Sequence, residues 1–144
     1  MTTKSKMFST KESSRSWTII DAKDKVVGRL ATKITGILRG KDKATFSPMS
    51  DTGNFVVVIN ATQLKFTGNK WLGKHYYSHT GFFGGLKDVT AEKMRERHPE
   101  KILYEAVWGM MPKNRLSKQL IRKLKIYPGA EHPHAAQQPA SANV

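Results

Sequence analysis

The sequence predicts an α/β domain with a parallel sheet that helices cover on both faces, flanked by extended terminal segments. FVVVINA at 55–61 is apolar at nearly every position, as in a strand buried on both faces of a parallel sheet. Before it, a strand-like SWTIID at 16–21 and a helical pattern starting near Val27 complete a strand, crossover helix and strand. The 144 residues, of which 38% are apolar, suit one compact domain, which we expect to span 16–128.

The first half of the domain is predicted from two kinds of spacing. Trp17, Ile19 and Ile20 supply residues typical of a strand. From about Val27 the apolar residues recur every three or four positions, as on one face of a helix, and Gly40 follows as a stop. In the next strand we expect all four central residues to be buried: Val56, Val57, Val58 and Ile59.

The middle of the chain predicts shorter elements. LKFTG at 64–68 and KHYYSH at 74–79 resemble short strands separated by a turn, and TGFFGGLKDVT at 80–90 resembles a glycine-containing loop. Thr90 is placed to begin a helix that continues through Arg97. Pro99 is placed to begin a second helix, whose apolar side contains Ile102, Leu103, Ala106 and Val107.

The segment PKNRLSKQLIRKLKIYP at 112–128 predicts a helix with one apolar and one cationic face. It contains six Lys and Arg residues and no acid. On a helix, the apolar stripe comprises Leu116, Leu120, Ile121 and Leu124, and the opposite band comprises Arg115, Lys118, Arg122 and Lys125. Like charges three or four residues apart repel, and a polyanion relieves that repulsion. A solvated surface is the alternative explanation of the charge.

Composition limits the classes of partner. The chain has 25 Lys and Arg against 11 Asp and Glu, a net charge of +14, and its pI is near 10.2. Such values are typical of a nucleic-acid-binding protein, although an anionic membrane surface is the alternative. There is no cysteine, which excludes disulfides and thiol chemistry and is compatible with the cytosol. The N-terminus lacks the apolar region of a secretory signal, so we expect a cytoplasmic protein.

Metal, cofactor and catalytic sites are not expected. His75 and His79 lie four apart, but in a strand that spacing corresponds to about 13 Å, and no carboxylate completes a ligand set. GFFGG at 81–85 lacks the pattern of a phosphate-binding loop, and no nucleophile motif is present. Its glycines allow either close approach to RNA or a turn with positive φ. Nearby aromatic residues either stack on bases or belong to the core.

The basic residues form the candidate binding site, because they occur in clusters along the chain. We expect the terminal segments 1–15 and 130–144, which lack apolar periodicity, to be mobile until a partner orders them. The candidate RNA-binding residues are Arg39, Lys41, Lys43, Lys70, Lys74, His79, Lys87, Lys113, Arg115, Lys118, Arg122, Lys123, Lys125, His132 and His134.

Five segments give the chain a resemblance to a known family: DTGNFVVVINA, GNK, YYSHTGFFGGLK, GMMPKNRLSKQLIRKLKIYPG and EHPHAAQQP. In this order and spacing, from about Trp17 to Pro139, they resemble the bacterial large-subunit ribosomal protein thirteen family. The resemblance implies a small, mainly parallel four-stranded sheet between helices, in α/β/α layers. It also implies a structural, non-enzymatic protein of the large ribosomal subunit that binds large-subunit rRNA early in assembly, beside neighbouring ribosomal proteins.

Two other classes remain open from the residues alone. An RNA-modifying or nucleotide-using enzyme needs a pocket with paired acid, base or metal groups. A peripheral membrane protein could use the basic amphipathic helix, although its apolar face is small for firm binding without a second anchor. We therefore expect the protein to have no cofactor, no small-molecule substrate and no membrane partner.

Overall fold

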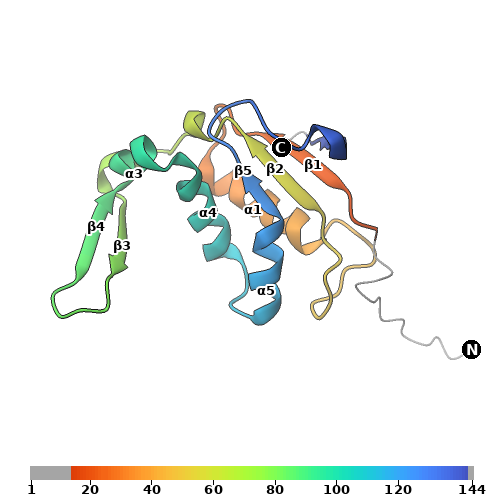
Figure 1. Ribbon diagram of the computed structural model, residues 1–144, viewed down its shortest axis with the longest axis horizontal. Coiled ribbons are helices and arrows are strands. Elements are labelled where there is room, and N and C mark those ends of the chain that lie inside the picture. The colour runs from red at the N-terminus through yellow and green to blue at the C-terminus, as the bar shows by residue number, and fades with distance from the viewer. Residues whose placement is uncertain (1–13, 143–144) are drawn as a thin grey trace, which may run out of the picture.

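The sheet of the computed structural model, which describes residues 14–142, has four parallel strands in the order β5-β2-β1-β6 (Figure 1). The strands are β1 (Trp17–Asp21), β2 (Phe55–Ile59), β3 (His75–His79), β4 (Leu86–Thr90), β5 (Leu124–Ile126) and β6 (Ala140–Ser141). The α-helices are α1 (Val27–Arg39), α2 (Lys70–Gly73), α3 (Ala91–Arg97), α4 (Pro99–Met110) and α5 (Arg115–Leu120). Single 3-10 turns are η1 (Ala61–Gln63), η2 (Ile121–Lys123) and η3 (Ala135–Gln137). The predicted fold class, α/β with a four-stranded parallel sheet, is confirmed.

The central strand and its crossover helix form as the sequence predicts. β2 pairs in parallel with β1 on one side and with β5 on the other. Val56, Val57 and Val58 have no exposed surface, whereas Ile59 at the end of the strand is only partly buried. α1 connects β1 to β2 and ends at Gly40, whose φ of 74° is the left-handed conformation that favours glycine.

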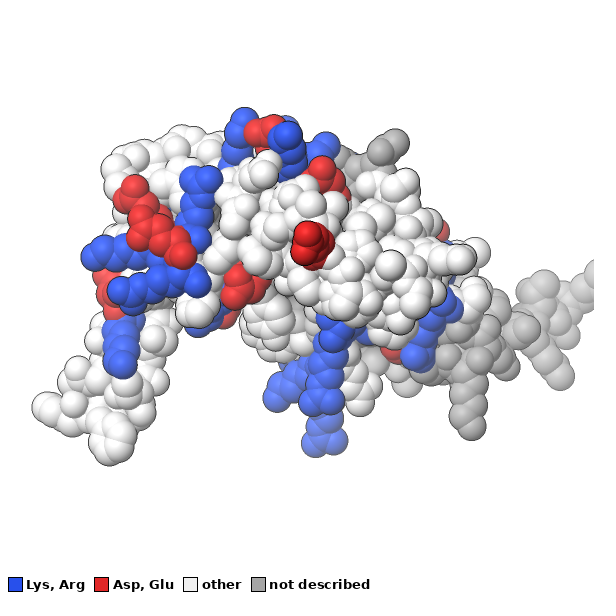
Figure 2. All heavy atoms as spheres, turned by 45° about the horizontal axis from the view of Figure 1, so that its top comes forward, with Lys and Arg blue, Asp and Glu red and all other residues white. Residues whose placement is uncertain are grey.

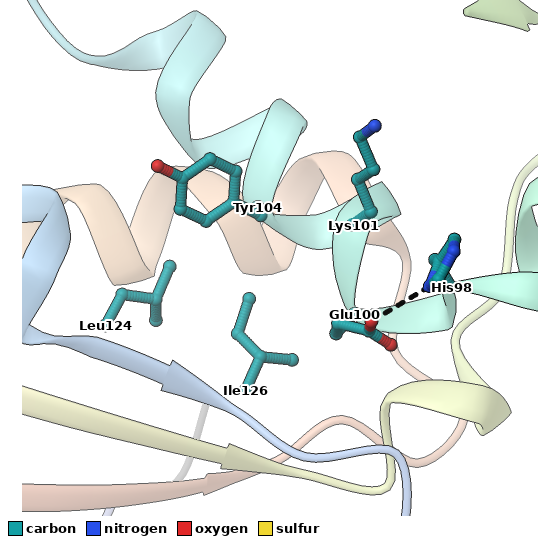
Figure 3. A pocket seen from close by; sticks show the side chains of 6 residues that line it. All are labelled: His98, Glu100, Lys101, Tyr104, Leu124 and Ile126. Atoms are coloured by element: carbon teal, nitrogen blue, oxygen red, sulfur yellow. Dashed lines mark ion pairs between the residues drawn. The ribbon is translucent and has the colours of Figure 1, made fainter.

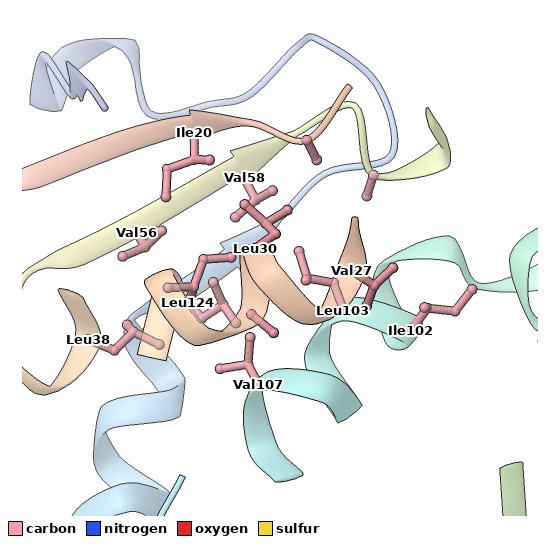
Figure 4. Packing of buried hydrophobic residues seen from close by; sticks show 14 of the residues in the cluster. Ile20, Val27, Leu30, Leu38, Val56, Val58, Ile102, Leu103, Val107 and Leu124 are labelled. Atoms are coloured by element: carbon pink, nitrogen blue, oxygen red, sulfur yellow. The ribbon is translucent and has the colours of Figure 1, made fainter. Parts of the chain in front are cut away.

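The core lies between one face of the sheet and the pair of helices α1 and α4. Figure 4 shows Ile20, Val56 and Val58 directed from the sheet toward the helices, where Leu30 and Leu103 meet them. These five side chains are at most 1% exposed. The predicted apolar side of α4 is confirmed, because Ile102, Leu103 and Val107 are buried and Ala106 packs against the same cluster.

The opposite face of the sheet is covered differently from the prediction. The rings of Trp17 and Phe55 stack there at 4.5 Å between centroids, and His134, immediately before η3, lies 4.9 Å from Trp17. The C-terminal segment, with its single 3-10 turn, thus occupies the place where we expected a further helix. It is extended as predicted, and its end joins the sheet, since β6 pairs with β1 and the Ala142 amide donates to Ile19 O at 3.0 Å. That a partner orders this segment stays a prediction. The prediction for residues 1–13 lies outside the described residues.

The basic segment is not one helix, which corrects the prediction for 112–128. α5 ends at Leu120, η2 follows, and Leu124–Ile126 becomes strand β5. Leu120 and Leu124 are both buried as the apolar stripe predicts, but they reach the core from different elements. The backbone explains the change, because β5 satisfies the hydrogen-bonding groups along the free edge of β2.

The middle of the chain forms a hairpin that projects away from the sheet (Figure 1). The predicted strand at 74–79 is confirmed as β3, but its partner is β4, within the segment that we expected to be a loop. LKFTG is not a strand, and only Lys65 makes an isolated bridge, to Val26. The expected turn at 68–73 contains the short helix α2. The predicted starts of α3 and α4 are confirmed at Thr90, whose side chain accepts from the Lys93 amide, and Pro99.

Candidate nucleic-acid interface

The largest group of candidate residues lies where α5 and the end of α1 come together. A shared pocket joins the two elements, lined by Arg39 and Phe46 on one side and by Leu116 and Leu120 on the other. We call this region the basic end, and its exposed or partly exposed cations are Arg39, Lys41, Lys43, Lys113, Arg115, Lys118 and Arg122. In Figure 2, Lys and Arg side chains extend below the body of the molecule, on the side where Figure 1 places α5.

Helix α5 presents its cations on one face because of its local sequence. Asn114 caps its first turn, accepting a hydrogen bond from the Ser117 amide at 2.8 Å. Arg115 and Lys118 are three residues apart on α5, and Arg122 follows four residues later in η2; all three are exposed. Between Ala106 and Ala130 there is no Asp or Glu. This face therefore combines adjacent positive charges with no acid from its own segment.

Some cations of the basic end also have partners within the protein. The Lys43 ammonium donates to Ser14 O at 2.7 Å, and the Arg39 guanidinium lies 5.6 Å from the centre of the Phe46 ring. Lys113 donates to Trp108 O and lies 4.3 Å from the centre of the Trp108 indole. These contacts restrict the positions of the three side chains, which remain exposed or partly exposed to solvent.

Lys123 does not belong to this exposed set, although the sequence placed it there. It is 5% exposed, and its ammonium donates to Asp51, to Gly53 O at 3.0 Å and to Leu38 O at 3.4 Å. Burial lowers the pKa of Lys123, and its hydrogen bond to Asp51 opposes that effect. Lys123 thus ties the loop at 51–53 to the last turn of α1 and cannot reach a ligand without unfolding this contact.

Gly53 explains how the loop approaches the helix so closely. A Cβ atom on Gly53 would lie 1.9 Å from Leu38 O, so no other residue fits without moving the backbone. Asp51 also lies 3.6 Å from the Arg15 guanidinium and accepts from the Gly53 amide at 3.3 Å. The DTG sequence therefore secures the loop beside the basic end.

A second group of candidate residues lies along the β3–β4 hairpin, with Lys70 and Lys74 before β3 and Lys87 near the tip end of β4. Lys70, Lys74 and Lys87 are exposed, and the Lys74 ammonium lies 5.1 Å from the centre of the Tyr76 ring. Lys70 and Lys74 line two hollows, one facing α1 and α4 and one on the hairpin itself. This group is separate from the basic end, and nearby α3 carries both acids and bases (Figure 2).

The hairpin tip carries two aromatic residues that are not among the fifteen candidate RNA-binding residues. Phe82 and Phe83 are among the most exposed large apolar residues, with Phe82 78% exposed and Phe83 fully exposed. Trp71 and Tyr76, in contrast, pack against the core cluster. The core alternative is thus confirmed for Trp71 and Tyr76, whereas base stacking by the exposed Phe82 and Phe83 stays a prediction.

Three of the remaining candidates, Lys125, His132 and His134, lie on the other face of the sheet or in the C-terminal segment that covers it. Lys125 in β5 is exposed, and it is paired with Val57 on the neighbouring strand β2. His134 shares a hydrogen bond of 2.9 Å with the Tyr127 hydroxyl, and its amide donates to His132 Nδ1 at 3.2 Å. These histidines hold the C-terminal segment in place. His79, the remaining predicted histidine, accepts from the Gly81 amide at 3.0 Å in the hairpin.

The pockets of the described residues offer little for catalysis. Figure 3 shows one between α4 and β5, where Leu124 and Ile126 point toward Tyr104. Its ion pair, between His98 and Glu100 at 3.6 Å, is well exposed, and no Ser, Thr or Cys lines the pocket. Within residues 14–142 there is no group of three His, Cys, Asp or Glu residues that could hold a metal ion. In the same range, no helix has the length and apolar character needed to cross a bilayer.

Comparison with known proteins places these features in a family. The model of the family described as Ribosomal protein L13 matches residues 15–133. The chain is similar to the large ribosomal subunit protein uL13 of Geobacter sulfurreducens, with 51% identity over 96% of this chain and 97% of that one. It is also similar to uL13 of Syntrophobacter fumaroxidans, with 56% identity over 88% and 89% of the two chains. For uL13 of Maridesulfovibrio salexigens the identity is 58% over 87% and 88%.

The matches extend through both groups of candidate residues and through the α/β core that carries them. They confirm the resemblance that the five sequence segments suggested, over nearly the same range. The chain belongs to the ribosomal protein L13 family, a family of structural, non-enzymatic proteins of the large ribosomal subunit.

Proposed function

We propose that the protein binds and organises large-subunit rRNA as a structural constituent of the cytoplasmic large ribosomal subunit, and that it joins the subunit early in assembly. The observation that carries this proposal is the face of Arg115, Lys118 and Arg122, three exposed cations on α5 and the following turn η2, in a segment that contains no Asp or Glu. Phosphates placed against such a face relieve its like-charge repulsion and release counterions from the RNA.

The α/β core gives this face a rigid support. Ser117 and Leu120 are buried on the inner face of α5. The loop that Lys123 holds contacts the adjoining end of α1. Fixed cations lose less conformational freedom on binding than cations on a mobile tail. The hairpin region, with Lys70, Lys74 and Lys87, adds a second contact on another part of the molecule. Two separate contacts allow one protein to hold two segments of folded RNA in a defined arrangement.

The structure gives less support to a membrane-binding function. The apolar residues of the basic segment are not available to lipid, because Leu120 is 3% exposed and Ile121 is 6% exposed. Interfacial binding needs an exposed apolar face as well as positive charge. The cations of the basic end therefore fit a polyanion such as RNA better than a lipid surface.

Charge substitution in α5 tests the proposal. In Arg115→Ala/Lys118→Ala/Arg122→Ala, we expect the slope of log affinity against log salt to decrease in magnitude by up to roughly three units, at about 0.7 to 0.9 per lost phosphate contact. The probe is deproteinised large-subunit rRNA, and a large-subunit core particle stripped of this protein supplies the assembled context. The fold should remain, because the buried residues are unchanged.

The chain offers a control with the same loss of charge. Lys93→Ala/Arg97→Ala/Lys101→Ala also removes three exposed cations, from α3 and α4, where Glu92, Glu96 and Glu100 stand among them. We expect it to change the slope much less. Equal effects of the two triple variants would mean that net charge alone matters. An unchanged slope in the α5 variant would show that this face is only solvated.

A further inference from the structure

The tip of the β3–β4 hairpin displays two adjacent phenyl rings to solvent. Phe82 and Phe83 are 78% and 110% exposed relative to a reference residue, and Leu86 beside them is 63% exposed. The tip lies at the end of the hairpin that projects from the body (Figure 1). Adjacent exposed apolar side chains often mark an interaction site, whereas a single exposed apolar residue is common on any protein surface.

Hydrogen bonds and glycines fix the loop that carries the rings. The Thr80 amide donates to Gly85 O at 3.0 Å, and the Gly85 amide donates to Phe82 O at 2.9 Å. A Cβ atom on Gly85 would lie 2.1 Å from the Thr80 hydroxyl, and Gly81 and Gly84 have φ values of 90° and 70°. The loop thus has one defined conformation before binding. Binding through the two rings therefore does not cost the free energy of ordering the loop.

The charge pattern along the hairpin indicates what the rings meet. Residues 79–86 contain no Lys, Arg, Asp or Glu in a chain of net charge +14, whereas Lys87 follows directly on β4. The next residue, Asp88, is paired with His75 at 2.8 Å. An uncharged tip has little to offer phosphates, but aromatic rings fit the exposed faces of unpaired bases. We propose that Phe82 and Phe83 stack on unpaired bases of large-subunit rRNA, while Lys87 beside the tip contacts a phosphate. This inference rests on the proposed rRNA-binding function and names the contact made by the hairpin.

Docking of the tip into an apolar pocket of a neighbouring protein fits less well. An aromatic side chain buries about 150 to 250 Å², so two phenyl rings offer roughly 300 to 500 Å². A stable protein interface buries about 800 Å² on each partner. The narrow tip falls short of that area, whereas a stacked base needs only one ring face.

Substitutions that separate planarity from apolarity test the proposal. In Phe82→Ala/Phe83→Ala, affinity for deproteinised large-subunit rRNA or for the stripped core particle should fall by roughly 5- to 150-fold for each stacked ring. Phe82→Leu/Phe83→Leu should lose most of the same affinity, because leucine is apolar but not planar. Phe82→Tyr/Phe83→Tyr should retain it. The salt slope should stay constant in all three, unlike that of the α5 variant, and thermal melting should be unchanged because the rings lie outside the core.

Several results would overturn the inference. Wild-type affinity in the alanine variant on both probes would show that the tip binds nothing there, and wild-type affinity in the leucine variant would show apolar docking instead of stacking. Ultraviolet cross-linking on the core particle should join the tip peptide to a nucleotide, and a cross-link to protein would contradict the proposal. If the wild-type chain binds neither probe, the rRNA-binding function itself fails. If the Phe82 and Phe83 variants bind like wild type while the Arg115/Lys118/Arg122 variant binds more weakly, the rRNA-binding function stands without this contact.

Discussion

Replacing the buried Lys123 with methionine should destabilise the fold without weakening the RNA contacts of a folded molecule. The side chains of Lys123 and Asp51 are 7% and 14% exposed, so Lys123→Met leaves a mostly buried carboxylate without its ammonium partner. Removing one member of such a pair costs about 3 to 5 kcal/mol. Because Arg15 lies 3.6 Å from Asp51 and Asp51 retains some exposure, we expect the lower end, about 3 kcal/mol.

The magnitude can be measured by urea and thermal unfolding. A loss of about 3 kcal/mol corresponds to a decrease in melting temperature of roughly 6 to 12 °C for a domain of this size, with an unchanged urea m-value. Asp51→Asn should cost more, because it leaves the less exposed ammonium of Lys123 without a charged partner.

A double-mutant cycle supplies the control. Lys123→Met/Asp51→Asn removes both charges, so its loss should be smaller than the sum of the single losses by about 0.5 to 3 kcal/mol. Additive losses, or a Lys123→Met variant as stable as wild type, would refute a stabilising pair. A reduced salt slope for rRNA binding in folded Lys123→Met would show that Lys123 contacts RNA after all.

Three further substitutions test the core, the loop and a partly buried tyrosine. Leu120→Ala should cost about 2 to 5 kcal/mol in urea unfolding, because Leu120 is 3% exposed. Gly53→Ala should lower the free energy of unfolding by about 1 to 3 kcal/mol or more, since the added Cβ would overlap Leu38 O. A loss below about 1 kcal/mol would disprove the close approach. Burial and the charge of Glu105 raise the pKa of Tyr76 to about 12 from 10.0, so the folded state retains a proton that the unfolded chain loses. Stability should therefore decrease as pH rises from 10.0 to about 12, and Tyr76→Phe should lack this decrease.

The sequence predicted those elements whose side chains show a clear period. Residues 17–21, 27–39 and 55–59 form the predicted strand, helix and strand, because burial on one or both faces dictates their apolar pattern. The start of α4 was also predictable, since Pro99 suits the first turn of a helix.

Elements held by backbone pairing were harder to predict. Leu124 continues the helical spacing of Leu116 and Leu120, yet it lies in β5, because the edge of β2 needs hydrogen-bonding partners from a distant segment. β6 pairs through only two residues and leaves no side-chain period. Tertiary pairing of this kind is invisible to a local pattern.

The candidate site was predictable in its charge but not in its accessibility. Lys118 and Lys123 are equivalent in a count of cations, but one is exposed and the other is buried against Asp51. Phe82 and Trp71 are both aromatic residues near lysines, and only their packing separates an exposed ring from a core ring. Exposure depends on the whole fold and therefore required the structure.

Sedimentation of the native chain tests the central proposal most directly. In a sucrose gradient of a lysate from cells that produce it, the protein should migrate with the large ribosomal subunit, and digestion of the RNA should release it. A core particle stripped of the protein should recover it stoichiometrically when the purified chain is added. Migration in the light fractions, or retention on the particle after its rRNA is digested, would contradict a structural role based on rRNA binding.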